Sequence, residues 1–330
     1  MKILLPLFTV IALVVIAFVG VQANLQPVFG IFIPYIAVAI FIVGFVVRVF
    51  KWGKSPVPFR IPTTAGQMKS FAPWIKANKI DNPSTPMAVF ARMFLEVFFF
   101  RSLFRNTKTQ LYPGTKLAYG SEKFLWLGGL AFHWSFLIIF VRHFRFFMQD
   151  VPSVIQIVEG LDSFLQIGAP LLYITDVILV GAVTFLFLRR VVMPQIKYIS
   201  LPADYFPLFL ILGIAISGIF MRYFTKVHVV GIKELVMGLL SFNPAIPEGI
   251  SSLFYVHLFL VSTLLAYFPF SKLMHMGGVF LSPTRNMANN SREVRHINPW
   301  DHPVHVHTYE EYENDFREKM KKAGLPVEKE

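Results

Sequence analysis

Six long apolar stretches limit what this chain can fold into. They lie at about residues 3–22, 29–49, 124–147, 170–193, 204–222 and 251–276. A helix that crosses a bilayer needs roughly 20 mostly apolar residues, and each stretch is too long and continuous for a buried strand. Only 15% of the residues are charged, whereas soluble domains of this length have roughly 25%. The sequence therefore predicts an all-α integral membrane protein, a bundle of about six transmembrane helices.

The chain contains no cysteine. This absence excludes disulfides, thiolate-bound zinc, iron–sulfur clusters and covalently attached c-type haem within this chain. Any metal that the protein binds must therefore be held by histidine, carboxylate or methionine side chains.

Basic residues concentrate on one side of the predicted bundle. With the N-terminus inside, the outer segments hold only five of the 31 Lys and Arg residues: Arg142, Arg145, Arg222, Lys226 and Lys233. This bias follows the positive-inside rule. We therefore expect both termini in the cytoplasm and the chain in the cytoplasmic (inner) membrane. The net charge of +12 reflects this topology, and we expect no nucleic-acid partner.

The predicted organisation has four parts. Residues 1–50 form two N-terminal transmembrane helices, and residues 51–123 form a basic cytoplasmic loop. Residues 124–276 form a core of four spans, and residues 277–330 form a polar tail. A single charged helix in this tail buries too little apolar surface to offset its own ordering entropy. We therefore expect the tail to be a cytoplasmic docking arm.

One segment of the loop, residues 86–104, is long enough to span a membrane. Arg92 and Glu96 are four residues apart and so share one helical face, and Arg101 ends the apolar run. These charges favour an amphipathic helix in the inner interface. A further span is the alternative, and it would move the tail to the outside.

Four histidines lie within predicted spans, where ionisable side chains are costly and indicate function. His133 and His143 are about three helical turns apart, and His257 and His275 are five turns apart, so each pair lies on one helical face. Two antiparallel helices of this kind can bind two stacked haems through four axial bonds. We expect His143 to pair with His257 near the outer surface and His133 with His275 near the inner one.

The inner pair fits straight helices less well than the outer pair. The two histidine spacings differ by about 12 Å along the helix axes. Pro269 lies between His257 and His275, and a kink there can take up part of the difference. Ordinary hydrogen-bonding histidines, or the proton relay or metal pathway of a non-redox transporter, are the alternatives.

The two histidine motifs carry a family resemblance. HWSFLIIFVRH in the third span and HLFLVSTLLAYFPFSKLMH in the sixth resemble the haem-binding helices of the nitrate reductase gamma-subunit family of di-haem b-type cytochromes. The resemblance covers residues 124–276. The two extra N-terminal spans and the tail resemble the DsrM branch of that family, which belongs to complexes of dissimilatory sulfur metabolism.

This resemblance implies a function in electron transfer. The implied cofactors are two haem b groups, one on His133 and His275 and one on His143 and His257. The implied substrate is quinol, menaquinol in most such organisms. The implied partners are a cytoplasmic iron–sulfur subunit of the heterodisulfide-reductase type (DsrK-like) and further membrane and periplasmic subunits. The haem subunit of a heterodisulfide or nitrate reductase is the alternative.

Three charged residues near these histidines are further candidates. Arg142 and Arg145 flank His143 and either bind haem propionates or anchor the helix at the interface. Asp176 lies within the fourth span and could accept a proton from quinol. The alternative is a carboxylate tied to neighbouring polar side chains or to an arginine of another helix.

Two other groups of residues have simpler interpretations. Gly213, Ser217 and Gly218 in the fifth span favour close contact between helices. The tail histidines could bind a metal: His296, His302, His305 and His307. HPVHVH lacks the i, i+4 spacing of common zinc sites, so a solvated segment ordered by a cytoplasmic subunit is favoured.

Overall fold

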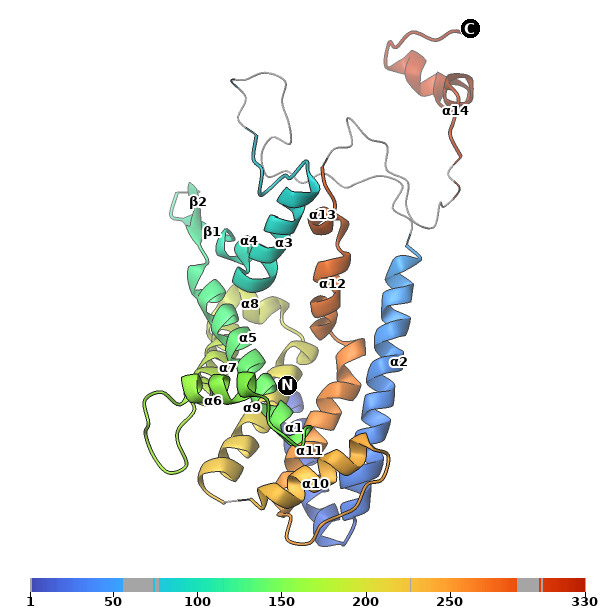
Figure 1. Cartoon of the computed structure of the whole chain (residues 1–330). Helices are drawn as coiled ribbons and strands as arrows, with labels where there is room; N and C mark the ends of the chain where they lie inside the picture. The colour runs from blue at the N-terminus through green and yellow to red at the C-terminus, as the bar shows by residue number, and fades with distance from the viewer. Residues whose placement is uncertain are drawn as a thin grey trace. The chain divides into compact units, whose positions relative to one another are not determined.

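The computed structural model describes residues 2–55, 74, 77–114, 116–225, 227–289, 303 and 305–329 (Figure 1). The chain divides into two compact units. The first consists of residues 1–49 and 91–282, and the second of residues 50–90 and 283–330. The first unit contains the long helices, and the second contains the C-terminal helix.

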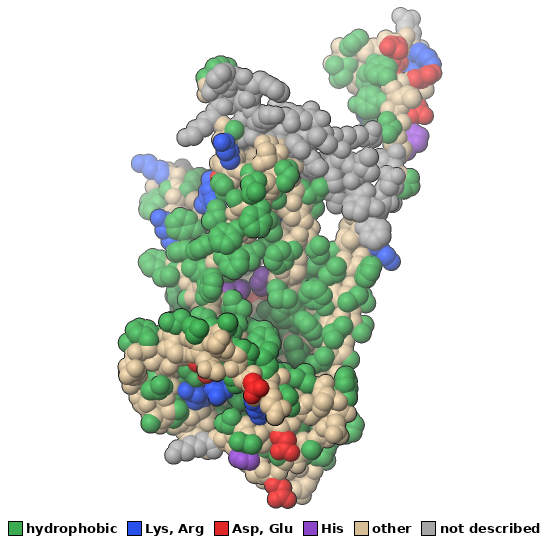
Figure 2. All heavy atoms as spheres, viewed as in Figure 1, with side chains coloured by type: hydrophobic (Ala, Val, Ile, Leu, Met, Phe, Trp, Pro, Cys, Tyr) green, Lys and Arg blue, Asp and Glu red, His purple; other side chains and the backbone are tan. Residues whose placement is uncertain are grey.

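Five helices in the described part of the chain are long and apolar enough to cross a membrane. Their α-helical parts are α1 (Leu4–Gln22), α2 (Ile33–Gly53), α5 (Lys123–His143), α9 (Pro202–Tyr223) and α11 (Ser252–Tyr267). A π-helical turn over Val28–Phe32 leads directly into α2. Figure 2 shows hydrophobic side chains over the visible face of these helices. Large exposed hydrophobic side chains, such as Phe8 and Val47, suit a lipid environment.

The fourth predicted span corresponds to α7 (Ile174–Val192), which packs against both α5 and α9. Its 19 residues extend about 28 Å, close to the thickness of the hydrocarbon core. Three charged residues near its ends, Asp176, Arg189 and Arg190, make it less apolar than the other five. Its role as a sixth span therefore remains a prediction.

The sixth predicted span, residues 251–276, is not one continuous helix. After α11 come two short 3₁₀ turns, Phe268–Phe270 and Lys272–Met274, and then α12 (His275–Leu281). Pro269 has no N–H to continue the ladder of α11. Ser271 follows in an extended conformation and accepts a hydrogen bond from the amide of Leu273. The expected kink is therefore a complete break, and it places His275 at the start of a new helix.

The main hydrophobic core lies where α1, α9 and α11 meet. Leu210 of α9 and Leu260 of α11 are fully buried there, together with Ala17 of α1. The π-helical turn and α2 are held against α11 and the residues after it by close contacts at two glycines. A Cβ atom at Gly30 would lie 3.0 Å from the ring of Tyr255, and one at Gly44 would lie 2.7 Å from Cβ of Pro269. The two N-terminal helices are therefore packed tightly onto α11 and its break.

Shorter elements connect the long helices. They are α3 (Pro86–Phe99), α4 (Arg101–Phe104), α6 (Ser153–Asp162), α8 (Pro194–Ile199), α10 (Val229–Leu240) and α13 (Pro283–Asn286). Between α4 and α5, strands β1 (Thr107–Tyr112) and β2 (Lys116–Ser121) form an antiparallel hairpin. The sequence of this part of the loop contains no recognisable motif.

The segment predicted as an interfacial helix, residues 86–104, forms α3 and α4. Phe100 separates them with a left-handed φ of 51°. At 14 residues, α3 extends about 21 Å and is short for a span. The indoles of Trp126 and Trp134 in α5 donate hydrogen bonds to the carbonyls of Phe99 and Phe98. The C-terminal end of α3 is thereby fixed to α5.

The tail contains α14 (Tyr309–Lys322), which begins with a capping box between Thr308 and Glu311. Glu313 is buried and accepts hydrogen bonds from the amides of Glu328 and Lys329, at 2.8 and 2.9 Å. The end of the chain therefore folds back onto α14. These polar contacts and the burial of Met320 stabilise the tail helix.

Candidate functional site

The four histidines of the predicted spans form two close pairs. His143 is the last residue of α5, and its ring centroid lies 6.4 Å from that of His257 in α11, with an angle of 11° between the planes. The rings of His133 in α5 and His275 at the start of α12 lie 5.9 Å apart at 79°. The break at Pro269 makes the second pair possible, because it shortens the path between His257 and His275.

Both distances suit a metal between the rings. Two imidazoles on opposite sides of one iron, each with a metal–nitrogen bond of roughly 2 Å, place their ring centroids roughly 6 Å apart. The side chains of His133, His143 and His275 are exposed, and that of His257 is half-buried. Figure 2 shows histidine side chains among hydrophobic ones in the middle of the helices. The rings are thus accessible from an apolar surface, as a haem requires.

The hydrogen bonds of the rings also suit metal ligands. In three of them Nδ1 lies next to a backbone carbonyl: His133 with Gly129 at 2.7 Å, His143 with Ile139 at 2.7 Å, and His275 with Lys272 at 2.8 Å. A carbonyl only accepts, so the proton is on Nδ1 and the lone pair is on Nε2. Metal-binding histidines have this arrangement, in which the second nitrogen donates to a fixed acceptor.

The fourth ring, His257, contacts helix α9. Its Nδ1 atom lies 2.9 Å from Oγ of Ser217, and Ser217 is buried. A Cβ atom at the neighbouring Gly218 would lie 3.4 Å from Cε1 of the same ring. These small residues do allow close helix contact, as the sequence suggested. The contact of Ser217 with a histidine was missed, although a hydroxyl beside a glycine in an apolar helix could have indicated it.

Aromatic side chains surround the pair of His133 and His275. The rings of Phe100 and Phe132 lie edge-on to His133, with centroids 4.9 and 4.8 Å away. Phe100 is the left-handed residue between α3 and α4, so the break in that segment directs an aromatic ring to this site. An apolar shell of this kind limits the access of water to a bound metal.

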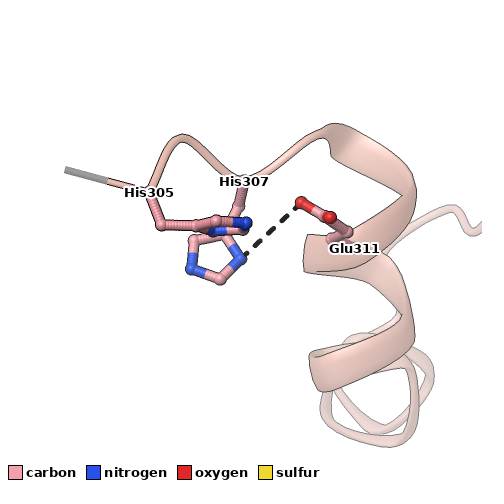
Figure 3. A group of neighbouring side chains, drawn as sticks. All are labelled: His305, His307 and Glu311. Atoms are coloured by element: carbon pink, nitrogen blue, oxygen red, sulfur yellow. Dashed lines mark ion pairs between the residues drawn. The ribbon is translucent and has the colours of Figure 1, made fainter. Parts of the chain in front are cut away.

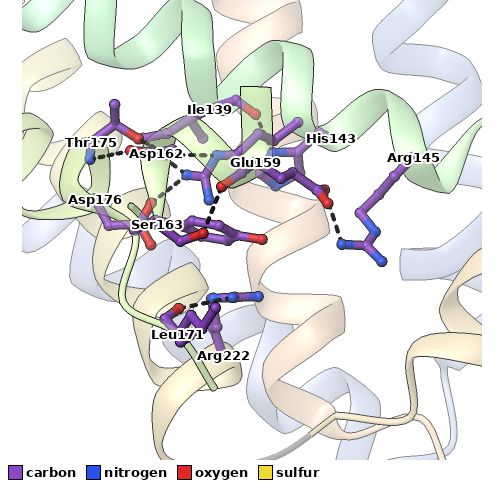
Figure 4. A network of polar contacts seen from close by, with 12 residues as sticks. Ile139, His143, Arg145, Glu159, Asp162, Ser163, Leu171, Thr175, Asp176 and Arg222 are labelled. Atoms are coloured by element: carbon purple, nitrogen blue, oxygen red, sulfur yellow. Dashed lines mark hydrogen bonds and ion pairs between the residues drawn. The ribbon is translucent and has the colours of Figure 1, made fainter. Parts of the chain in front are cut away.

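Beside the other pair lies a buried network of charges (Figure 4). Nη2 of Arg142 lies 2.6 Å from Asp176, and Nε lies 3.1 Å from Asp162. Asp162 ends α6 and also accepts hydrogen bonds from the amide and hydroxyl of Thr175, at 2.8 and 2.6 Å. Arg142 is therefore an ion-pair partner inside the protein. Asp162 was not identified from the sequence.

Tyr173 joins a second arginine to this network. The guanidinium carbons of Arg142 and Arg222 lie 3.7 and 3.8 Å from the centroid of the Tyr173 ring. The hydroxyl of Tyr223 donates to Asp176 at 2.9 Å and accepts from the amide of Tyr173 at 3.0 Å. Asp176 is thus tied to an arginine and a tyrosine of other helices, which is the alternative that the sequence left open.

Arg145 lies at the edge of this region. Its Nη1 atom is 2.9 Å from Glu159 of α6, and its side chain is 38% exposed. The corresponding value for Arg142 is 7%. The two arginines that flank His143 therefore differ, because Arg142 is enclosed by the protein and Arg145 is accessible.

The tail histidines form a separate, exposed group. The ligand atoms of His305, His307 and Glu311 lie within 4.8 Å of one another (Figure 3). The carboxylate of Glu311 also accepts the amide of Thr308 at 2.9 Å, so it caps α14. His296 and His302 lie outside the described residues.

These observations define a multi-pass membrane protein with paired histidines between its helices. The family model described as nitrate reductase gamma subunit matches residues 88–295, a region that contains all four histidines. The chain belongs to the nitrate reductase gamma subunit family. The resemblance noted in its sequence is therefore confirmed.

Two similar proteins come from archaea. A protein of Archaeoglobus fulgidus named "Hdr-like menaquinol oxidoreductase cytochrome b-like subunit" is 46% identical over 281 residues, which cover 83% of each chain. A protein of Archaeoglobus profundus with the same name is 42% identical over 277 residues, covering 82% of this chain and 81% of the relative. The matches are long enough to include most of the helical bundle.

Proposed function

We propose that this protein is a di-haem cytochrome b subunit of a menaquinol-oxidising complex. The observation that carries the proposal is the pairing of the four histidines, at ring distances of 5.9 and 6.4 Å. The names of the two archaeal relatives, which include the words menaquinol oxidoreductase and cytochrome b-like, support it. His133 and His275 would hold one haem, and His143 and His257 the other.

The haems would give the chain a path for single electrons across the membrane. We assign six spans, with α7 as the fourth, and place both termini in the cytoplasm because of the distribution of Lys and Arg. Helix α5 then runs from the inner to the outer side. His133 and His275 lie toward the inner face, and His143 and His257 toward the outer face, where quinol would bind.

Asp176 is our candidate for the group that accepts a proton from quinol. When Asp176 is protonated, its bond with Arg142 weakens, but Arg142 keeps Asp162 as a charged partner, 3.1 Å away. Arg142 therefore still has one negatively charged partner after Asp176 is protonated. A buried charge that keeps a partner costs less than one left unpaired. Arg145, which is accessible next to His143, is the candidate for contact with a haem propionate.

The acceptor would be a cytoplasmic iron–sulfur subunit of the heterodisulfide-reductase type (DsrK-like). The chain has no cysteine and so cannot bind such a cluster through thiolates itself. In the proposed topology, loop 51–123 and tail 277–330 both face the cytoplasm and are available for docking. Dissimilatory sulfur metabolism is the setting that we infer for the complex.

Single histidine variants of the purified complex test the pairing. We expect two haems per chain in a reduced-minus-oxidised spectrum, and each His→Ala variant should lose one, because iron held by imidazoles loosens when one ligand is removed. His143→Ala and His257→Ala should lose the same haem and prevent its reduction by quinol. His133→Ala and His275→Ala should lose the other and stop delivery to the partner.

His228→Ala is the matched control, since this residue precedes α10 and belongs to neither pair. It should retain both haems. A His257→Ala variant that behaves like His133→Ala would show that the pairs are wrongly assigned. A wild-type complex without haem in this chain would overturn the proposed function.

A further inference from the structure

The four paired histidines are not held in the same way. Nδ1 of His133, His143 and His275 is fixed by a carbonyl three or four residues earlier in the chain. Any side chain at those earlier positions would leave the hydrogen bond in place. His257 differs, because its Nδ1 partner is the side chain of Ser217, from another helix. A substitution of Ser217 in α9 therefore removes a side-chain hydrogen-bond partner from one histidine of the four.

The hydroxyl of Ser217 has a defined direction. Its oxygen lies 2.9 Å from the carbonyl oxygen of Ile214 and 2.9 Å from Nδ1 of His257. The carbonyl oxygen of Ile214 has no hydrogen, so the single hydrogen of the Ser217 hydroxyl must lie between these two oxygens. Ser217 therefore donates to Ile214 and accepts from Nδ1–H of His257. The lone pair of His257 is then on Nε2, the atom available to a metal.

This contact also fixes the plane of the ring. His257 lies nearly parallel to His143, with an interplanar angle of 11°, whereas the planes of His133 and His275 are at 79°. Ser217 holds one edge of the His257 ring, and the backbone of Gly218 approaches the same edge. The χ2 torsion of histidine is broad when nothing restrains it. The contact with Ser217 is therefore one of the restraints that hold the ring in the parallel orientation.

We propose that Ser217 is a positioning residue that fixes the plane of His257 and lowers the reduction potential of the haem held by His143 and His257. The inference rests on the proposed function. A histidine that donates from its second nitrogen is a more basic ligand, and a more electron-rich ligand favours the oxidised iron. Hydrogen bonding to an axial ligand is one of the means by which a protein sets a haem potential.

Ser217→Ala in the full-length chain, within its complex, tests this proposal. Two measurements are needed: a redox titration of both haems, and the electron paramagnetic resonance spectrum of the oxidised protein, which reports the angle between axial imidazoles. We expect the potential of one haem to rise and its resonance signal to move, while the other haem keeps both values. His143→Ala identifies the affected haem, because the resonance signal that moves in Ser217→Ala should be the one that is missing in His143→Ala.

Two further variants provide the controls. Ser217→Thr retains a hydroxyl and should restore both measurements toward the wild type. Ser262→Ala removes another buried hydroxyl, which donates to Leu258 within α11 at 2.8 Å, and should change neither haem.

An unchanged titration and spectrum in Ser217→Ala, or an equal change in both haems, would overturn the inference while leaving the proposed function intact. A wild-type protein without haem would overturn both. Loss of only the haem of His143 and His257 in Ser217→Ala, with recovery in Ser217→Thr, would support the inference.

Discussion

At the scale of single residues, the charges near His143 are arranged to compensate one another. Arg142 and Arg222 lie on Tyr173, and Asp162 and Asp176 supply two negative charges to the same region. Breaking a buried ion pair leaves an uncompensated charge and costs about 3–5 kcal/mol. The two aspartates differ in what else they do. Asp162 also binds the first turn of α7, while Asp176 also binds Tyr223.

Asp162→Ala should destabilise the bundle. It removes the 3.1 Å contact with Arg142 and both hydrogen bonds to Thr175, so we expect a loss of about 3 kcal/mol or more. The measurement is the thermal unfolding of the purified protein in detergent. Glu159→Gln is the control, because Glu159 pairs with the accessible Arg145 and should cost less than about 1 kcal/mol. Equal stability of the two variants would contradict a structural role for Asp162.

Asp176→Asn should slow the reduction of the haems by quinol, while both haems stay bound. The amide can still accept from Tyr223 but can no longer take up a proton as a carboxylate does. We expect both haems to be present and reducible by dithionite, with reduction by quinol slowed by roughly 100-fold or more, the usual size of a lost acid–base group. Stopped-flow reduction with each donor measures this. A normal rate with quinol would show that Asp176 is only an ion-pair partner.

At the scale of elements, the break after α11 decides whether the second pair of histidines can form. In one straight helix His275 would lie about 27 Å from His257, whereas His133 and His143 are about 15 Å apart along α5. The 3₁₀ turns change the direction of the chain and begin α12 at His275. Pro269 and Ser271 are the residues whose local chemistry stops the α11 ladder.

The double variant Pro269→Ala/Ser271→Ala should weaken this break. It restores an N–H at position 269 and removes the side-chain acceptor of Leu273, so α11 can continue and displace His275. We expect a reduced content of the haem held by His133 and His275, with the other haem retained, as measured by haem spectra. Pro202→Ala, at the first position of α9, is the control and should retain both. Full retention in the double variant would show that other contacts impose the break.

At the scale of the whole molecule, apolar length predicted the helices, and the distribution of Lys and Arg is the basis of the orientation that we propose for them. Five of the six expected stretches correspond to helices that can cross a membrane. The histidine spacing predicted which residues come together. It did not predict the break at Pro269, because proline in a helix permits either a kink or an end. Asp162 and Ser217 were missed as functional residues, because their partners are on other helices.

Reporter fusions test the proposed topology. A reporter after Glu330 should be on the cytoplasmic side, and one inserted near Ser153, at the start of α6, should be outside. These positions are separated by three spans if α7 crosses the membrane, so an odd number of crossings is required. Accessibility to a membrane-impermeant label provides the measurement. Finding both positions on one side would exclude six spans.

The close contacts of Gly30 with Tyr255 and of Gly44 with Pro269 have a consequence for biogenesis. The ribosome releases the N-terminal helices first, so α1 and α2 enter the membrane long before α11 is made. Gly30 and Gly44 of the second helix lie where α11 and the break after it later pack closely against this helix. The matched family region begins at residue 88, so this early pair lies outside it. We therefore expect the second N-terminal helix, which carries both glycines, to be in the membrane before the segment that carries His257 and His275 docks against it.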